Sequence, residues 1–131
     1  MLSAPTLEIL EALCAESHEA YPEGGTLWTY TEGANQAHAH FRETSQTIAS
    51  GALDPDALGR WLQWAVGDRD ATKPESVERA KALLATLQRD LSPDEWLWSL
   101  EDNGTDMRGV LRMARRTDNR YFSLELLWSE D

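Results

Sequence analysis

The chain has almost no cysteine and no long apolar run. Cys14 is the single cysteine among 131 residues, which excludes an internal disulfide. It falls on the apolar face of a predicted helix, which favours a buried and inert thiol. No stretch approaches the roughly 20 apolar residues that a membrane-spanning helix needs, and residues 1–5 lack the basic start of a signal peptide. We therefore expect a cytoplasmic protein without a membrane partner.

Positive charge is nearly absent from the first fifty positions, which contain one basic residue, Arg42, and seven acidic residues. The other eleven of the 12 Lys and Arg lie downstream, and the net charge of the chain is −11. A surface of this sign repels nucleic acid and anionic membrane and attracts basic partners. The charge pattern therefore predicts a basic protein or protein complex as the partner, without direct binding of nucleic acid. The oligomeric state stays open.

Motifs for cofactors and catalysis are also missing. Gly24-Gly25 reads as a turn and lacks the spacing of a phosphate-binding loop, and no serine lies on a nucleophile-elbow pattern. His38 and His40 point to the same side of a predicted strand, but two ligands do not define a zinc site. We expect no cofactor, no metal and no enzyme activity, and we keep a metal-dependent enzyme using the His38/His40 strand as an alternative.

The composition is that of a folded protein. Its hydrophobic fraction of 41% and its six tryptophans supply enough apolar surface to offset the high net charge. The length suits one domain, and no linker or internal repeat divides the chain. We therefore expect residues 1–131 to form a single domain.

A first helix is predicted from Thr6 to about Ala20, with Ser3 or Thr6 as its cap. Its apolar stripe consists of Leu7, Leu10, Leu13 and Cys14. The acidic residues on its opposite side, within an arc of roughly 140° at about 100° per residue, are Glu8, Glu11, Glu16 and Glu19. Pro22 to Gly25 ends the helix. The helix therefore presents one apolar and one anionic face.

The remaining pattern alternates strands and helices. Residues 26–30 and 37–44 read as a hairpin, and residues 46–50 extend it or add a strand. Two helices follow, at 54–67 and from Pro74 to Leu91, the second with a surface pair of Glu75 and Arg79. The apolar seam of that second helix is Val77, Ala80, Leu84, Leu87 and Leu91.

Three strands close the chain. Residues 92–100 combine a helix-capping motif with an alternating Trp96, Trp98 and Leu100, and we favour a strand. Strands at 107–115 and 121–128 follow, the last with Phe122 to Trp128 alternating toward one face. The order of helix, hairpin, two helices and three-stranded meander predicts an α+β fold, with helices on one face of a mainly antiparallel sheet.

Charged and aromatic residues supply the candidate sites. Arginines between 108 and 120 are expected to pair with nearby acids rather than bind an anion. General acid chemistry would need Glu101 or Glu125 in an apolar pocket. The tryptophans are expected in the core, except for one at the edge of its helix stripe. The candidate binding residues are Glu8, Glu11, Glu16, Glu19, Glu23 and Trp64.

Three functions fit these features. The favoured one is a small acidic inhibitor, of the immunity or anti-defence type, that blocks a basic surface of a toxin, nuclease or nucleic-acid-binding complex as a nucleic-acid mimic. The second is a secretion-type chaperone or adaptor, which would need an exposed apolar strip or a self-complementary strand edge. The third is the metal-dependent enzyme already named.

Overall fold

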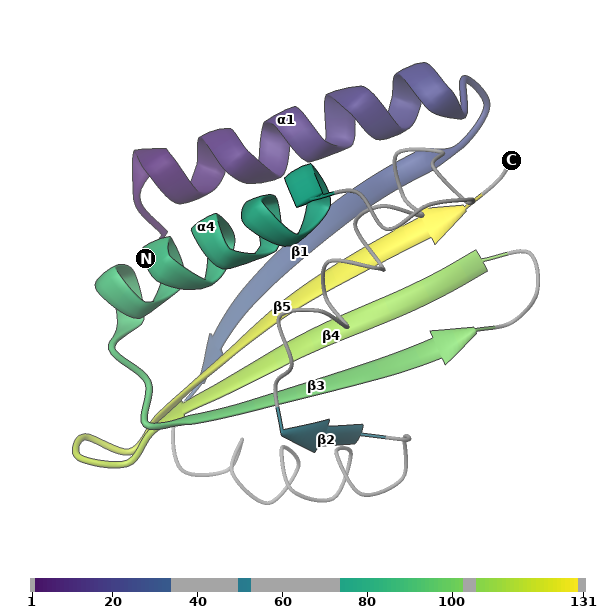
Figure 1. Cartoon of the computed structure of the whole chain (residues 1–131). Helices are drawn as coiled ribbons and strands as arrows, with labels where there is room; N and C mark the ends of the chain where they lie inside the picture. Colours follow the sequence, from purple (N-terminus) through teal and green to yellow (C-terminus); the bar gives the residue numbers. More distant parts are fainter. Residues whose placement is uncertain (1, 34–49, 53–73, 103–105, 130–131) are drawn as a thin grey trace.

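The computed structural model describes residues 2–33, 50–52, 74–102 and 106–129. The described elements, in chain order, are α1 (Ala4–Ala20), β1 (Gly25–Gly33), β2 (Ser50–Ala52), α4 (Pro74–Leu91), β3 (Glu95–Asp102), β4 (Asp106–Arg115) and β5 (Arg120–Ser129) (Figure 1). The predicted strand at 37–44, with His38 and His40, and the predicted helix at 54–67, with Trp61 and Trp64, lie outside the described residues.

The strands form one antiparallel sheet in the order β1-β5-β4-β3-β2. The three-stranded meander β3-β4-β5 is confirmed, and residues 95–102 form a strand rather than a helix. The first strand does not stay with its sequence neighbours, because β1 pairs with the last strand along its whole length, from Gly25 opposite Ser129 to Gly33 opposite Tyr121. The final strand is therefore held between β1 and β4.

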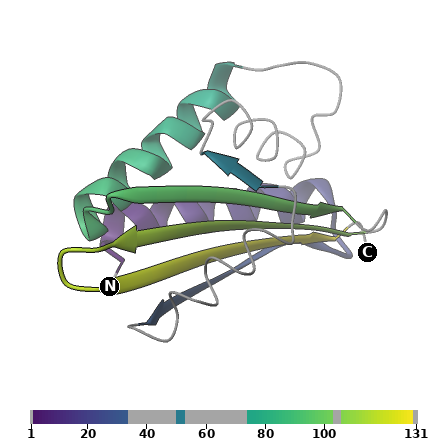
Figure 2. The same ribbon diagram turned by 90° about the horizontal axis from the view of Figure 1, so that it is seen from below.

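Both described helices cover the same face of the sheet. Figure 1 shows α1 and α4 side by side over β1 and β5, and in Figure 2 the strands pass in front of α1. This arrangement confirms the predicted α+β fold. Neither α1 nor α4 is long and apolar enough to cross a lipid bilayer, and no other helix belongs to the described part of the chain.

The core lies between the helix layer and the sheet. Period-two alternation places four consecutive inward side chains of β5 there, with exposed fractions of 3%, 0%, 1% and 2% for Phe122, Leu124, Leu126 and Trp128. Tyr21, just after α1, meets the Trp128 ring edge-on, with centroids 5.0 Å apart. Because the burial alternates as the sequence alternates, the predicted inner face of this strand is confirmed.

Each helix is rotated relative to its predicted stripe. In α4, Leu83 is fully buried, whereas the predicted Leu84 is only half-buried. In α1, Thr6 and Ser17 are completely buried, whereas Leu7 and Cys14 are only partly buried, so the predicted stripe was wrong at those two positions. The reason is that each helix packs on the sheet and on the other helix at once, and the buried arc faces both neighbours.

The face of the sheet away from α1 and α4 also carries apolar residues. Ala114 and Tyr121 are buried there, with Leu97 packed against them. Nearer the edge strand, Leu27 and Leu127 lie directly opposite each other across β1 and β5 and are 63% and 38% exposed. Single exposed leucines are common, but two adjacent ones beside an edge strand form a small apolar strip.

Candidate functional site

The predicted acidic residues lie on the outer side of α1 and just beyond its end. Glu8, Glu11, Glu16 and Glu19 belong to the helix, Glu23 follows it, and all five are exposed. The helix turns its buried side toward the sheet, so these carboxylates point toward solvent. We call this set the acidic face.

One member of the acidic face is neutralised within the protein. The carboxylate of Glu16 forms an ion pair with the guanidinium of Arg79 on α4, and the two side chains are 49% and 26% exposed. Glu11 lies close enough to Cys14 for its carboxylate to raise the pKa of the thiol. Among the described residues, no ion pair joins Glu8, Glu11, Glu19 or Glu23. Four of the five predicted carboxylates are therefore not paired with any cation of the described residues.

A groove runs beside the acidic face, between α1 and α4. It is a shallow hollow, open to solvent, with a volume of about 560 Å³, and it is lined by Pro5, Glu8, Ile9, Ala12, Glu78, Arg79 and Ala82. Two of its lining residues, Ala12 on α1 and Ala82 on α4, are small and exposed, so larger side chains at these positions would fill part of the hollow. This groove was not predicted from the sequence, where its trace is exposed alanine on both helices.

Polar contacts hold α1 firmly in place. At its N-terminus, the carboxylate of Asp90 on α4 accepts hydrogen bonds from the Ser3 amide (2.9 Å) and the Thr6 hydroxyl (2.6 Å). Toward its other end, the buried hydroxyls of Ser17 and Thr26 are hydrogen-bonded at 2.8 Å and join the helix to β1. These bonds satisfy polar groups that burial would otherwise destabilise. The acidic face therefore stands on a rigid support.

Asp90 takes the place of the predicted helix cap. Ser3 is the N-cap residue, but its side chain makes no capping hydrogen bond. Partial burial pushes the pKa of Asp90 upward, yet the hydrogen bonds from Ser3 and Thr6 outweigh that effect and hold this pKa below its ordinary value. A carboxylate at a helix N-terminus is also favoured by the helix dipole. This carboxylate comes from the neighbouring helix α4, so residue spacing within α1 does not predict the contact.

Cys14 is half-buried and lies beside an acid. Burial raises the pKa of its thiol, and the nearby Glu11 carboxylate raises it further. Both effects disfavour the thiolate, which is the reactive form. The expectation of an unreactive thiol is consistent with these surroundings.

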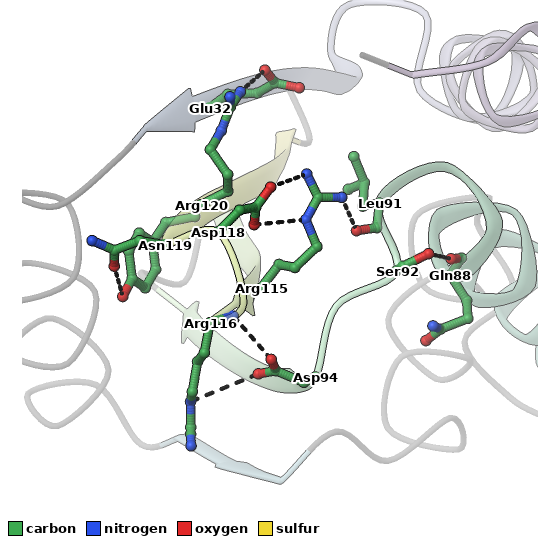
Figure 3. A network of polar contacts seen from close by, with 11 residues as sticks. Glu32, Gln88, Leu91, Ser92, Asp94, Arg115, Arg116, Asp118, Asn119 and Arg120 are labelled. Carbon is green, nitrogen blue, oxygen red and sulfur yellow. Dashed lines mark hydrogen bonds and ion pairs between the residues drawn. The ribbon is translucent and has the colours of Figure 1, made fainter.

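Four of the meander arginines, Arg108, Arg115, Arg116 and Arg120, are paired with acids, as predicted, and the last three belong to the network in Figure 3. The fifth, Arg112, is buried in the sheet, which the sequence pattern did not predict. Arg115 donates two hydrogen bonds to Asp118, of 2.9 and 3.0 Å, and a third of 2.6 Å to the carbonyl oxygen of Leu91 at the end of α4. The bidentate pair holds the pKa of Asp118 below its usual value. Arg115 therefore ties the last turn of α4 to the turn between β4 and β5.

The neighbouring arginines also form ion pairs with acids of the strands. Arg116 forms ion pairs with Asp94 and Glu95 at the start of β3, and Arg120 contacts Glu32 on β1 at 3.1 Å. The cationic groups of this region thus link the ends of the strands. Anion binding is not needed to explain them.

Of the alternative catalytic residues, only the side chain of Glu125 belongs to the described part of the chain. Arg108 holds Glu125 in an ion pair of 2.7 Å, so this carboxylate is not isolated in an apolar pocket. No group of three potential metal ligands occurs in residues 2–33, 50–52, 74–102 and 106–129. His38 and His40, like Trp64, fall outside these ranges.

Comparison with known proteins adds no relative. No protein-family model matches the chain, and no curated protein sequence matches it.

Proposed function

We propose that this protein is a small acidic binding protein that inhibits a basic partner, in the manner of an immunity or anti-defence protein. The partner would be a toxin, a nuclease or a nucleic-acid-binding complex, whose cationic surface normally faces phosphates. The acidic face would occupy that surface in place of the nucleic acid.

The exposed and unpaired carboxylates of the acidic face carry this proposal. Glu8, Glu11, Glu19 and Glu23 lie in the solvent on one helix and its C-terminal extension, without an ion pair to the described arginines. In a protein with a net charge of −11, pairing these carboxylates with the protein's own basic residues would reduce charge repulsion and stabilise the fold. Leaving them without such partners is therefore consistent with a role in binding. The arginines of the meander do pair with acids, but with those of the strands and turns.

Several charges of one sign on a protein surface affect binding mainly by changing the association rate. A rigid anionic surface attracts a cationic partner over a distance of about 10 Å at moderate salt, and such steering raises association rates about 10- to 1000-fold. Apolar contacts then slow dissociation. The acidic face thus has the charge for the first step, and it stands beside a groove that is able to supply the second.

A capture experiment with charge-matched variants tests the proposal. The immobilised protein is exposed to lysate, and captured proteins are identified for the wild type and for a variant with Glu8, Glu11, Glu19 and Glu23 changed to Gln. A control variant neutralises four acids from other parts of the sequence, Asp56, Asp68, Asp70 and Asp131, and so matches the change in net charge. We expect the wild type and the control to capture the same basic protein and the α1 variant to lose it. Equal capture by both variants would contradict the proposal.

The strip of Leu27 and Leu127 favours the adaptor as a second candidate. An adaptor or chaperone of this size commonly works as a dimer, and β1 is the edge of the described sheet, with neither Lys nor Pro to discourage pairing. Sedimentation of the wild type and of a Leu27→Thr variant separates the two functions. A dimer that Leu27→Thr dissociates would support the adaptor, whereas a monomer at all concentrations would rule it out.

A further inference from the structure

We propose that the groove between α1 and α4 receives an amphipathic basic helix of the partner protein. The inference rests on the proposed function and adds to it the kind of segment that the partner inserts. It starts from the groove itself, which is formed by described residues on both helices.

The floor of the groove is apolar and open. Its apolar lining comes from Pro5, Ile9, Ala12 and Ala82, and Ile9 is partly buried and packs against the core. A volume of about 560 Å³ is within the usual range for binding sites and exceeds what a single side chain fills. Removing these apolar groups from water would favour an occupant with apolar side chains of its own.

The shape suits a helix. The α1 residues of the groove run from Pro5 to Ala12, which is about 10 Å along the axis at 1.5 Å per residue. That length matches roughly two turns of a third helix lying against α1 and α4. An amphipathic helix that places apolar residues at i, i+3, i+4 and i+7 in a groove between helices is an established mode of recognition.

The rim of the groove sets the sign of the partner's charge. Glu8 on α1 and Glu78 on α4 both line it and are exposed. Glu78 is paired with Lys81 at 3.6 Å, so Glu8 is the rim carboxylate without an ion pair among the described residues. The guanidinium of Arg79 lies in the wall, but Glu16 neutralises it. Glu19 continues the negative charge along α1. A helix that buries its apolar side in this groove would therefore place Lys or Arg against Glu8 and toward Glu19.

A synthetic peptide provides the probe. It consists of leucine and lysine, with leucines at i, i+3, i+4 and i+7 so that it forms an amphipathic helix. A scrambled peptide of the same composition and a version with glutamate for lysine are the controls. Titration by fluorescence or calorimetry at several salt concentrations gives the affinities, and NMR shift mapping gives the site. We expect binding of the amphipathic basic peptide alone, with the largest shifts at Ile9, Ala12 and Ala82.

Filling the groove separates shape from charge. Ala12→Phe places a ring in the hollow without changing any charge, and Ala15→Phe adds the same ring to an exposed position of α1 outside the groove. We expect Ala12→Phe to weaken binding about tenfold or more and Ala15→Phe to leave it unchanged. Ala82→Phe and Ala85→Phe form the same matched pair on α4, so the test survives if one variant fails to fold. Equal effects within each pair would overturn the inference.

Arg79 offers a test with the opposite sign. Arg79→Gln removes a positive charge from the groove wall and releases the Glu16 carboxylate. We expect the peptide to bind several-fold more tightly to this variant, with a steeper dependence on salt. A loss of structure alone would weaken binding, so only the charge account predicts a gain. Unchanged or weaker binding by a folded Arg79→Gln protein would contradict it.

The two proposals fail in different ways. If the Gln variant of the acidic face loses its captured partner while Ala12→Phe keeps it, the proposed function holds and the groove inference is wrong. If both variants keep the partner, both proposals are wrong.

Discussion

The hydroxyl of Thr6, completely buried on α1, donates a 2.6 Å hydrogen bond to the carboxylate of Asp90 in the last turn of α4. The carboxylate lies at the C-terminus of its own helix, where the dipole disfavours it, and at the N-terminus of the neighbouring helix, where the dipole favours it. The contact fixes the acidic helix at the end where the groove begins.

Asp90→Asn should destabilise the protein by about 1–2 kcal/mol, because the hydrogen bonds at the start of α1 lose their charged acceptor. Thr6→Val should have a similar effect, since it keeps the shape of the side chain and removes the donor. Urea unfolding measures both. Glu78→Gln changes the charge of α4 equally but breaks only an exposed pair with Lys81, and it should change the free energy of unfolding by less than about 0.5 kcal/mol.

The contribution of Asp90 should disappear in acid. Its pKa is lower in the folded protein than its ordinary value of 3.8, so its stabilising effect is complete above that value and is lost as the pH falls through the folded pKa. The difference in unfolding free energy between the wild type and Asp90→Asn should therefore shrink between about pH 5 and pH 2. A difference that stays constant over this range would show that the carboxylate charge is not what stabilises α1.

Gly109 is required by the ring of Trp98. A Cβ atom at this position of β4 would overlap Cη2 of the indole and lie 2.9 Å from Cζ2. We expect Gly109→Ala to lower the free energy of unfolding by about 1–3 kcal/mol through overpacking. In a Trp98→Leu background the same change should cost much less, since the clashing atoms are gone. A double-mutant cycle without coupling would show that the glycine serves another purpose.

Ser92→Gly should stabilise the protein. Ser92 follows α4 with φ of 47°, a left-handed conformation that glycine adopts without a steric penalty. The Ser92 hydroxyl donates only a long hydrogen bond of 3.4 Å to the carbonyl oxygen of Gln88. We therefore expect a gain of about 1 kcal/mol in thermal or urea unfolding. Asn119, with φ of 58°, is the matched comparison: its side-chain oxygen accepts a hydrogen bond from the Tyr121 hydroxyl, so Asn119→Gly should gain less.

Cys14 should react slowly with thiol reagents at neutral pH. Burial and the Glu11 carboxylate both raise the pKa of its thiol, so the midpoint of the alkylation rate against pH should lie above the ordinary cysteine value of 9.0. Glu11→Gln removes the second cause and should shift that midpoint downward. If Glu11→Gln leaves the midpoint unchanged, the Glu11 carboxylate does not affect the thiol.

The fold followed from local patterns because those patterns coincide with tertiary contacts. Phe122 to Trp128 alternate in the sequence and in burial, since every second side chain of a strand faces the helices. The helix stripes were less accurate. Because Thr6 and Ser17 are polar, hydrophobic periodicity does not place them in the buried stripe of α1. Both are nevertheless buried, since Asp90 and Thr26 supply their hydrogen bonds from other elements.

The candidate site could be predicted only in part. Exposure of the acidic residues followed from helix periodicity, which is local. The ion pair of Glu16 with Arg79 depends on the packing of two helices far apart in the chain, whereas the sequence suggested only a local pairing of Arg79 with Glu75. The groove depends on the same packing, and no single segment contains it.

The central claim is that the carboxylates of the acidic face attract a cationic partner. Its most direct test is the association rate of the captured partner, measured by stopped flow over a range of ionic strength, for the wild type and for the protein with Glu8, Glu11, Glu19 and Glu23 changed to Gln. The account predicts a wild-type rate that is at least about tenfold higher at low salt and falls steeply as salt is added, with a nearly flat dependence for the variant. Equal rates and equal salt dependence in the two proteins would contradict it.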